Sequence, residues 1–133
     1  MDSIPRLELD VKDRSQAATV LLLEQEDSLR RVIVLTLKQM GMKVLEASDA
    51  PSARKYLKNH NPDLFVLNFD HPSGKNGNLI NLYREKTGVD QGGVLLTTTQ
   101  RPDDNWRELY KPDIVVYKPF DIRYLVKRIT TLT

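Results

Sequence analysis

Short apolar runs recur along the chain and are separated by segments whose apolar residues fall at helical spacing. The most continuous run, Leu64 to Leu67, follows Asn61-Pro62 and precedes Pro72, a pattern that predicts a strand buried on both faces. Four other runs predict strands at 20–23, 43–47, 94–98 and 113–117. The run at 43–47 is more polar, so we expect it nearer an edge of a sheet.

The segments between these runs predict helices. In the first segment the apolar positions have a helical period, a cap is expected at Asp27 or Ser28, and Gly41 should end the helix. A second helix should open at Ser48 or Asp49. Three more helices are expected near 77–86, around 103–110 and from 121 onward. Strand and helix alternate five times, which favours an α/β fold with a parallel sheet and helices on both of its faces.

Composition bounds the class of protein. The chain of 133 residues is long enough for one domain, and the polar residues 1–17 predict an N-terminal arm ahead of a domain at 18–133. The net charge of +2 is too mild to indicate a nucleic-acid partner. The absence of cysteine excludes disulfides and thiolate chemistry. No stretch has the pattern of a signal peptide or a membrane span, so we expect a cytoplasmic protein with no membrane partner.

Polar residues follow four of the predicted strands. Glu24-Gln25 follows the first strand, Asn68 the third and Thr98 the fourth, while Lys118 and a proline follow the fifth. The carboxyl ends of parallel strands meet at one edge of a sheet, so these side chains could share a pocket.

On these residues, together with PDLFVLN at 62–68 and KPF at 118–120, the chain resembles the receiver domain of two-component response regulators over residues 18–132. The resemblance implies a flavodoxin-like sheet with strand order 2-1-3-4-5. It also implies a signalling module rather than an enzyme, with a histidine kinase, an output domain or another signalling protein as partner. In that family an acidic pair holds Mg²⁺ after the first strand, and an aspartate after the third strand accepts a phosphoryl group.

This sequence departs from the family at those positions. Asn68 stands where the acceptor aspartate would be, and an amide cannot attack phosphorus as a carboxylate does. Gln25 stands in the acidic pair, so Glu24 is left as a single negative charge, and we expect Mg²⁺ binding to be weak or absent and no other cofactor. The pattern predicts a pseudo-receiver with a vestigial pocket formed by Glu24, Gln25, Asn68, Thr98 and Lys118.

Two alternatives remain open for this pocket. Asp70, two residues beyond Asn68, could act as a substitute acceptor in an active phosphotransfer module, with Glu24 and Asp70 as weak candidate metal ligands. Alternatively, the vacated acidic pocket could bind a small ligand and act as a sensor.

The last third of the chain carries the expected switch and partner surface. The resemblance implies an aromatic switch residue three positions before Lys118, where this chain has Val115. The segment from Thr98 to Val115 is also about two residues shorter than the family pattern. Aromatic residues concentrate in this third and suggest a protein interface or homodimer surface. The expected interface residues are Trp106, Tyr110, Tyr117 and Tyr124.

Overall fold

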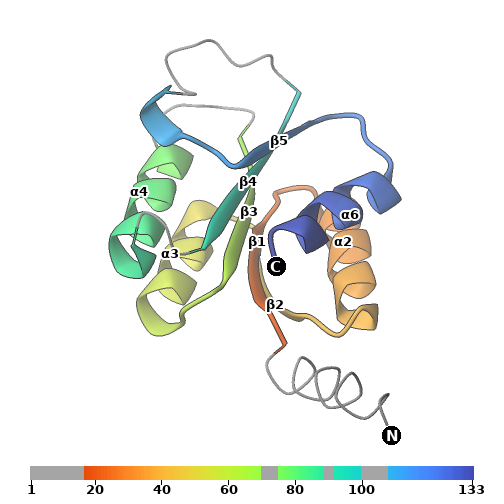
Figure 1. Cartoon of the computed structure of the whole chain (residues 1–133), viewed down its shortest axis with the longest axis horizontal. Helices are drawn as coiled ribbons and strands as arrows, with labels where there is room; N and C mark the ends of the chain where they lie inside the picture. The colour runs from red at the N-terminus through yellow and green to blue at the C-terminus, as the bar shows by residue number, and fades with distance from the viewer. Residues whose placement is uncertain (1–16, 70–74, 89–91, 100–107) are drawn as a thin grey trace, which may run out of the picture.

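The computed structural model describes residues 17–69, 75–88, 92–99 and 108–133. Within them the chain forms a five-stranded, all-parallel sheet with the order β2-β1-β3-β4-β5 (Figure 1). The predicted strand order and the edge position of the second strand are therefore confirmed. The strands are β1 Thr19–Leu23, β2 Lys43–Ala47, β3 Leu64–Asn68, β4 Gly93–Thr98 and β5 Ile114–Tyr117.

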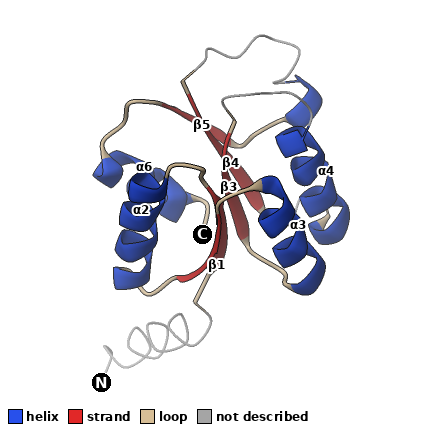
Figure 2. Ribbon diagram, turned by 180° about the vertical axis from the view of Figure 1, so that it is seen from behind, coloured by secondary structure: helices blue, strands red, loops and turns tan. Residues whose placement is uncertain are grey.

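Helices cover both faces of the sheet. Figure 2 shows α2 and α6 on one face and α3 and α4 on the other. Their bounds are α2 Asp27–Gln39, α3 Ala50–Asn59, α4 Lys75–Thr87 and α6 Ile122–Thr131. Of the helix expected around 103–110, residues 108–110 are described and are helical. Nearly all of the predicted arm lies outside the described residues. Among the helices that the structure describes, none is long and apolar enough to cross a membrane.

The sheet separates two hydrophobic layers because successive side chains of a strand point to opposite faces. In β3, Leu64 and Val66 pack in the α2–α6 layer, whereas Phe65 and Leu67 pack in the α3–α4 layer. All residues of β3 and β4 are buried. These two central strands therefore fix the positions of the polar residues at their ends.

The helix ends agree with two of the predicted signals. Gly41 has φ +87° and follows the cap of α2, where its N–H donates to the carbonyl of Lys38 and the next N–H, of Met42, donates to Leu37. This pair of bonds is the Schellman motif, which needs a left-handed residue. At the start of α3, the Asp49 carboxylate accepts the N–H of Ser52 at 2.9 Å.

The expected cap of α2 is wrong. The helix starts at Asp27 with Glu26 as its N-cap, and the Glu26 side chain makes no capping hydrogen bond. The Asp27 carboxylate is 2.7 Å from the Arg30 guanidinium, so it forms an ion pair on the helix surface instead of accepting a backbone N–H.

Candidate functional site

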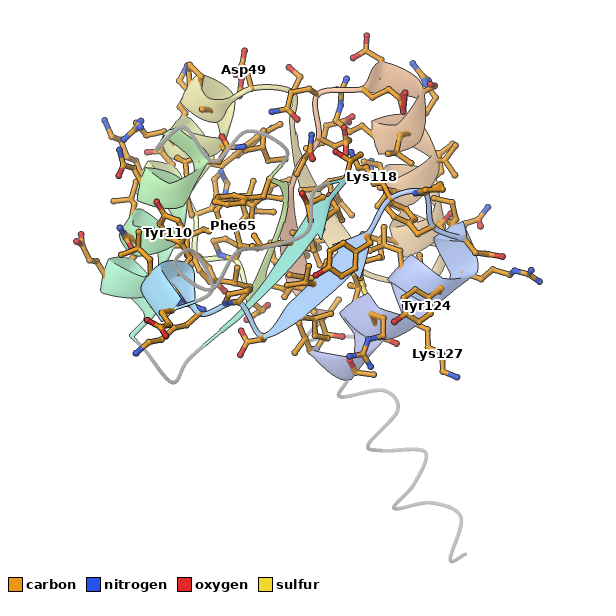
Figure 3. All side chains as sticks on the ribbon, turned by 90° about the horizontal axis from the view of Figure 1, so that it is seen from above. Asp49, Phe65, Tyr110, Lys118, Tyr124 and Lys127 are labelled. Carbon is orange, nitrogen blue, oxygen red and sulfur yellow. The ribbon has the colours of Figure 1, made fainter. Side chains whose placement is uncertain are left out.

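The parallel register brings the ends of β1, β3, β4 and β5 to one edge of the sheet. The backbone ladder continues past the strands, with the N–H of Phe69 donating to Thr97 at 2.7 Å and that of Lys118 donating to Thr98 at 2.8 Å. Figure 3 shows Lys118 at these strand ends, with Tyr110 on the α4 side. The predicted pocket residues come from four strands, and the structure brings them together.

An ion pair crosses this pocket between the first and last strands. The Lys118 ammonium lies 3.0 Å from Oε1 of Glu24, and the two side chains are 16% and 3% exposed. The other carboxylate oxygen of Glu24 accepts the N–H of Glu26 at 2.9 Å. Arg30 donates to the backbone carbonyl of Glu24 at 2.9 Å. Glu24 is thus held in place by contacts to three parts of the chain.

An amide pair lies between β1 and β3. Nδ2 of Asn68 donates to Oε1 of Gln25 at 2.8 Å, while Oδ1 of Asn68 is buried and has no hydrogen-bond partner among the residues that the structure describes. Asn68 itself is 9% exposed. Asn76, in the first turn of α4, donates its amide to the carbonyl of Asn68 at 2.7 Å. The two side chains at the departing positions therefore bind each other.

Thr98 is fully enclosed at the end of β4. Its hydroxyl donates to the carbonyl of Phe69 at 3.3 Å, which joins the ends of β3 and β4 by a side-chain bond as well as by the ladder. Phe69, directly after Asn68, lies where the sequence places the end of the buried strand. Asn76 was not predicted as a pocket residue, because it follows in a turn-like stretch and only the fold brings it close to Asn68.

The oxygens in this pocket carry little negative charge for a cation. Glu24 supplies the carboxylate, and its charge already faces Lys118. Gln25 offers an amide oxygen that already accepts from Asn68, and Oδ1 of Asn68 has no donor within the described ranges. In the part of the chain that the structure describes, no three His, Cys, Asp or Glu residues are grouped to hold a metal ion. Asp70 lies outside that part.

The residues expected in the last third separate into two groups. Tyr117 and Tyr124 are 41% and 52% exposed, as expected for a surface. Tyr110 is buried against Phe69 and so differs from the prediction, because its helical turn directs the ring into the α3–α4 layer. Val115 packs partly buried in the same layer. Trp106 lies outside the described residues.

A surface hollow of about 660 Å³ lies at the opposite, amino ends of the strands. Its lining includes Asp63, Gly93, Asp113 and Leu132. Asp63 and Asp113 each use a carboxylate oxygen to accept a strand N–H, from Thr19 and Val94. These carboxylates therefore stabilise the amino-terminal ends of β1 and β4. The candidate functional site is the pocket at the carboxyl ends of the strands.

The sequence matches the response regulator receiver domain family over residues 20–130. It is 34% identical over 115 residues to the phosphate regulon transcriptional regulatory protein PhoB of Escherichia coli (strain K12), covering 85% of this chain and 50% of that protein. For the protein of the same name from Pseudomonas aeruginosa the identity is 29% over 113 residues, covering 84% and 49%. The chain thus spans about half the length of the curated relatives that it matches.

Solved structures share the fold at low sequence identity. A CheY-like response regulator receiver domain protein from Methanospirillum hungatei superposes with a TM-score of 0.75 at 15% identity, covering 86% of this chain and 92% of that one. A response regulator from Thermotoga maritima gives 0.72 at 20% identity, covering 87% and 97%. Sheet order and sequence match agree: the chain belongs to the response regulator receiver domain family.

Proposed function

We propose that this receiver domain acts in two-component signalling without being phosphorylated at the usual position, and that it signals through protein–protein contacts. The observation that carries the proposal is Asn68 at the end of β3, with its amide nitrogen bonded to Gln25. Receiver domains in general are signalling modules that interact with histidine kinases and output domains.

The chemistry of the amide supports the loss of phosphoryl transfer. Acyl-phosphate formation needs an ionised carboxylate that attacks phosphorus. The amide nitrogen of Asn68 has its lone pair delocalised into the carbonyl, and it is occupied in donating to Gln25. Lys118, which in the family faces the phosphoryl group, here neutralises Glu24. Asn68, at the acceptor position, and Lys118, which would stabilise the phosphoryl group, are thus each bound to a residue that follows β1.

Weak or absent Mg²⁺ binding belongs to the same proposal. Receiver domains in general bind Mg²⁺ at their acidic pocket. Mg²⁺ dehydrates reluctantly and is usually held by carboxylates in near-octahedral geometry. Here a cation would have to compete with Lys118 for Glu24 and with the Asn68 amide for Gln25. These residues do not suit Mg²⁺, so signalling by this domain does not depend on bound Mg²⁺ in our proposal.

The proposed partner surface is formed by β5 and α6. Tyr117 on β5 and Tyr124 on α6 are exposed aromatic side chains, and Arg123 and Lys127 on α6 are exposed cations. Exposed aromatic residues beside arginine are typical of protein interfaces. We propose that this β5–α6 surface, defined by these four residues, binds a second copy of the chain, an output domain or another signalling protein, in preference to nucleic acid.

Incubation with acetyl phosphate and Mg²⁺, followed by intact-mass measurement, tests the proposal. We expect no mass increase of one phosphoryl group and no Mg²⁺-dependent rise in thermal stability with beryllofluoride. A receiver that retains its acceptor aspartate is the positive control. Stoichiometric, Mg²⁺-dependent labelling would overturn the proposal. If that labelling were lost in Asp70→Asn, the phosphotransfer alternative with Asp70 as acceptor would replace it.

A further inference from the structure

Tyr110 occupies an interior position next to the pocket. Its ring packs edge to face on Phe69, with centroids 5.4 Å apart and planes at 69°. Tyr110 is 9% exposed and Phe69 is fully buried. Phe69 directly follows Asn68, and its carbonyl accepts the Thr98 hydroxyl. The ring of Tyr110 therefore rests on the residue that joins the ends of β3 and β4.

The far end of the same ring rests on α4. A Cβ added at Gly77 would lie 2.6 Å from Cε1 of Tyr110 and closer still to Cζ and the hydroxyl oxygen. The ring can occupy this position because Gly77 has no side chain. The neighbouring Asn76 donates to the carbonyl of Asn68, so the first turn of α4 touches both the pocket and Tyr110.

A second contact fixes the backbone at Tyr110. Arg84, two turns further along α4, donates to the carbonyl of Tyr110 and, at 2.6 Å, to that of Lys111. Its guanidinium is 4.0 Å from the Asp113 carboxylate. Lys111 has φ +45°, a left-handed conformation that is costly for a residue with a side chain and is held here by its surroundings. The stretch 110–113, which leads directly into β5, is therefore attached to α4 at two points.

We propose that Tyr110 is a latch between the pocket and the β5–α6 surface. Through Phe69 and Gly77 it ties the end of β3 to α4 and to the entry into β5, and it thereby holds that surface in one arrangement. Val115 has no ring with which to make such a connection, and Tyr110 supplies an aromatic contact from the same α3–α4 layer. That the β5–α6 surface binds a partner rests on the proposed function, whereas the latch does not depend on it.

Hydrogen exchange monitored by mass spectrometry tests the latch through Gly77→Ala. In a helix this change is ordinarily stabilising, because alanine has the higher helix propensity. Here the methyl group should displace the Tyr110 ring. We expect amide exchange at 110–117 to accelerate by about tenfold or more, while exchange in β1 and α2 stays within about twofold.

Three further variants distinguish the latch from simple destabilisation. In a Tyr110→Ala background, Gly77→Ala should add less than about twofold, because the atoms it would strike are gone. Tyr110→Phe keeps the ring and should leave exchange at 110–117 within about twofold of the parent. Leu57→Ala, a core truncation in α3 within the same α3–α4 layer, should not accelerate 110–117 selectively. A Gly77→Ala chain that folds only together with Tyr110→Ala would support the latch in stronger form.

The latch is overturned if acceleration in Gly77→Ala stays within the first turn of α4. Independent, multiplying effects of the two substitutions would also overturn it, as would the same exchange pattern in Leu57→Ala or accelerated exchange in Tyr110→Phe. These readouts involve no phosphoryl group. Labelling of the parent chain by acetyl phosphate would therefore refute the proposed function and leave the latch standing, whereas the exchange results bear on the latch alone.

Discussion

The pocket at the strand ends and the β5–α6 surface beside it treat their chemically active side chains in opposite ways. In the pocket, Glu24 faces Lys118 and the Asn68 amide nitrogen donates to Gln25, so the charges are paired and the two amides bind each other within the chain. On the surface, Tyr117 and Tyr124 present their rings to solvent. The two regions are joined at Lys118, which directly follows Tyr117.

This contrast between pocket and surface indicates which region of the domain can respond to a partner. Two buried charges lose much of their hydration on folding, and their attraction for each other compensates for that loss. Exchanging one partner for an external ligand is therefore costly. An exposed aromatic side chain loses little when it is covered and gains apolar contact. A domain whose pocket charges are paired from within is therefore better suited to respond through its surface. Each of the following predictions would break or sharpen this contrast.

The largest effect is expected from Lys118→Met. It leaves the Glu24 carboxylate buried without its cation, and removal of one partner of a buried ion pair typically costs about 3–5 kcal/mol of unfolding free energy. Urea denaturation measures the loss. The double variant Glu24→Gln/Lys118→Met is the control and should recover much of the stability, because no unpaired charge remains. A loss below about 1 kcal/mol in the single variant would place this pair with ordinary surface ion pairs and weaken the contrast.

Asn68→Asp should have an intermediate effect on stability and none on labelling. The change removes the donor to Gln25 and adds a second carboxylate to the pocket, at a cost of about 1–3 kcal/mol. Adding Gln25→Asp should make the chain more stable in Mg²⁺ and improve labelling by acetyl phosphate, because the pocket then holds three carboxylates. Urea denaturation with and without Mg²⁺ and intact-mass measurement follow both effects, with Gln25→Asp alone as control. Equal labelling of the single and double variants would contradict the prediction.

Alanine at Tyr117 or Tyr124 should alter association rather than stability. Both side chains are exposed, so the unfolding free energy should change by no more than about 0.5 kcal/mol. If the β5–α6 surface self-associates, light scattering over a concentration series should show weaker association of these variants. Val32→Ala removes a comparably exposed apolar side chain from α2 and serves as the matched control. An equal loss of association in that variant would show that the β5–α6 surface is not special.

The smallest effect concerns the caps of two helices. The Arg123 side chain, followed by its backbone N–H, lowers the pKa of Asp121 at the start of α6. Bonds from Ser52 lower the pKa of Asp49 at the start of α3 in the same way. A carboxyl whose pKa is lower in the folded state stabilises the fold above the ordinary aspartate pKa. That contribution disappears as pH falls through the lowered value.

Acid titration of stability therefore compares the two caps. Asp121→Asn and Asp49→Asn should each flatten the low-pH limb of the curve slightly. Because α6 carries Tyr124 and α3 does not, the Asp121 variant alone should also change association above the lowered pKa, where the parent carboxylate is charged, and should converge with the parent at acid pH. If Asp49→Asn changed association equally, the effect would be one of overall charge and not of the β5–α6 surface.

Much of the fold could be predicted because its signals are local. The apolar run Leu64–Leu67 identified a doubly buried strand, and the more polar 43–47 identified an edge. The polar residues after the strands gave the position of the pocket, since the carboxyl ends of parallel strands share an edge. The prediction of the α2 cap was wrong because the Asp27 carboxylate had two possible partners, the backbone N–H groups and Arg30. The sequence does not show which of the two it binds.

The sequence by itself determined which residues could perform the family chemistry. Asn68 and Gln25 are neutral whatever the fold, because the covalent structure of an amide sets its charge. The tertiary structure decided which groups meet. Lys118 binds Glu24 across 94 positions of sequence, and Tyr110 turns inward onto Phe69 instead of outward to solvent. Periodicity reports the environment along one element, whereas these contacts depend on how separate elements pack around the strand ends.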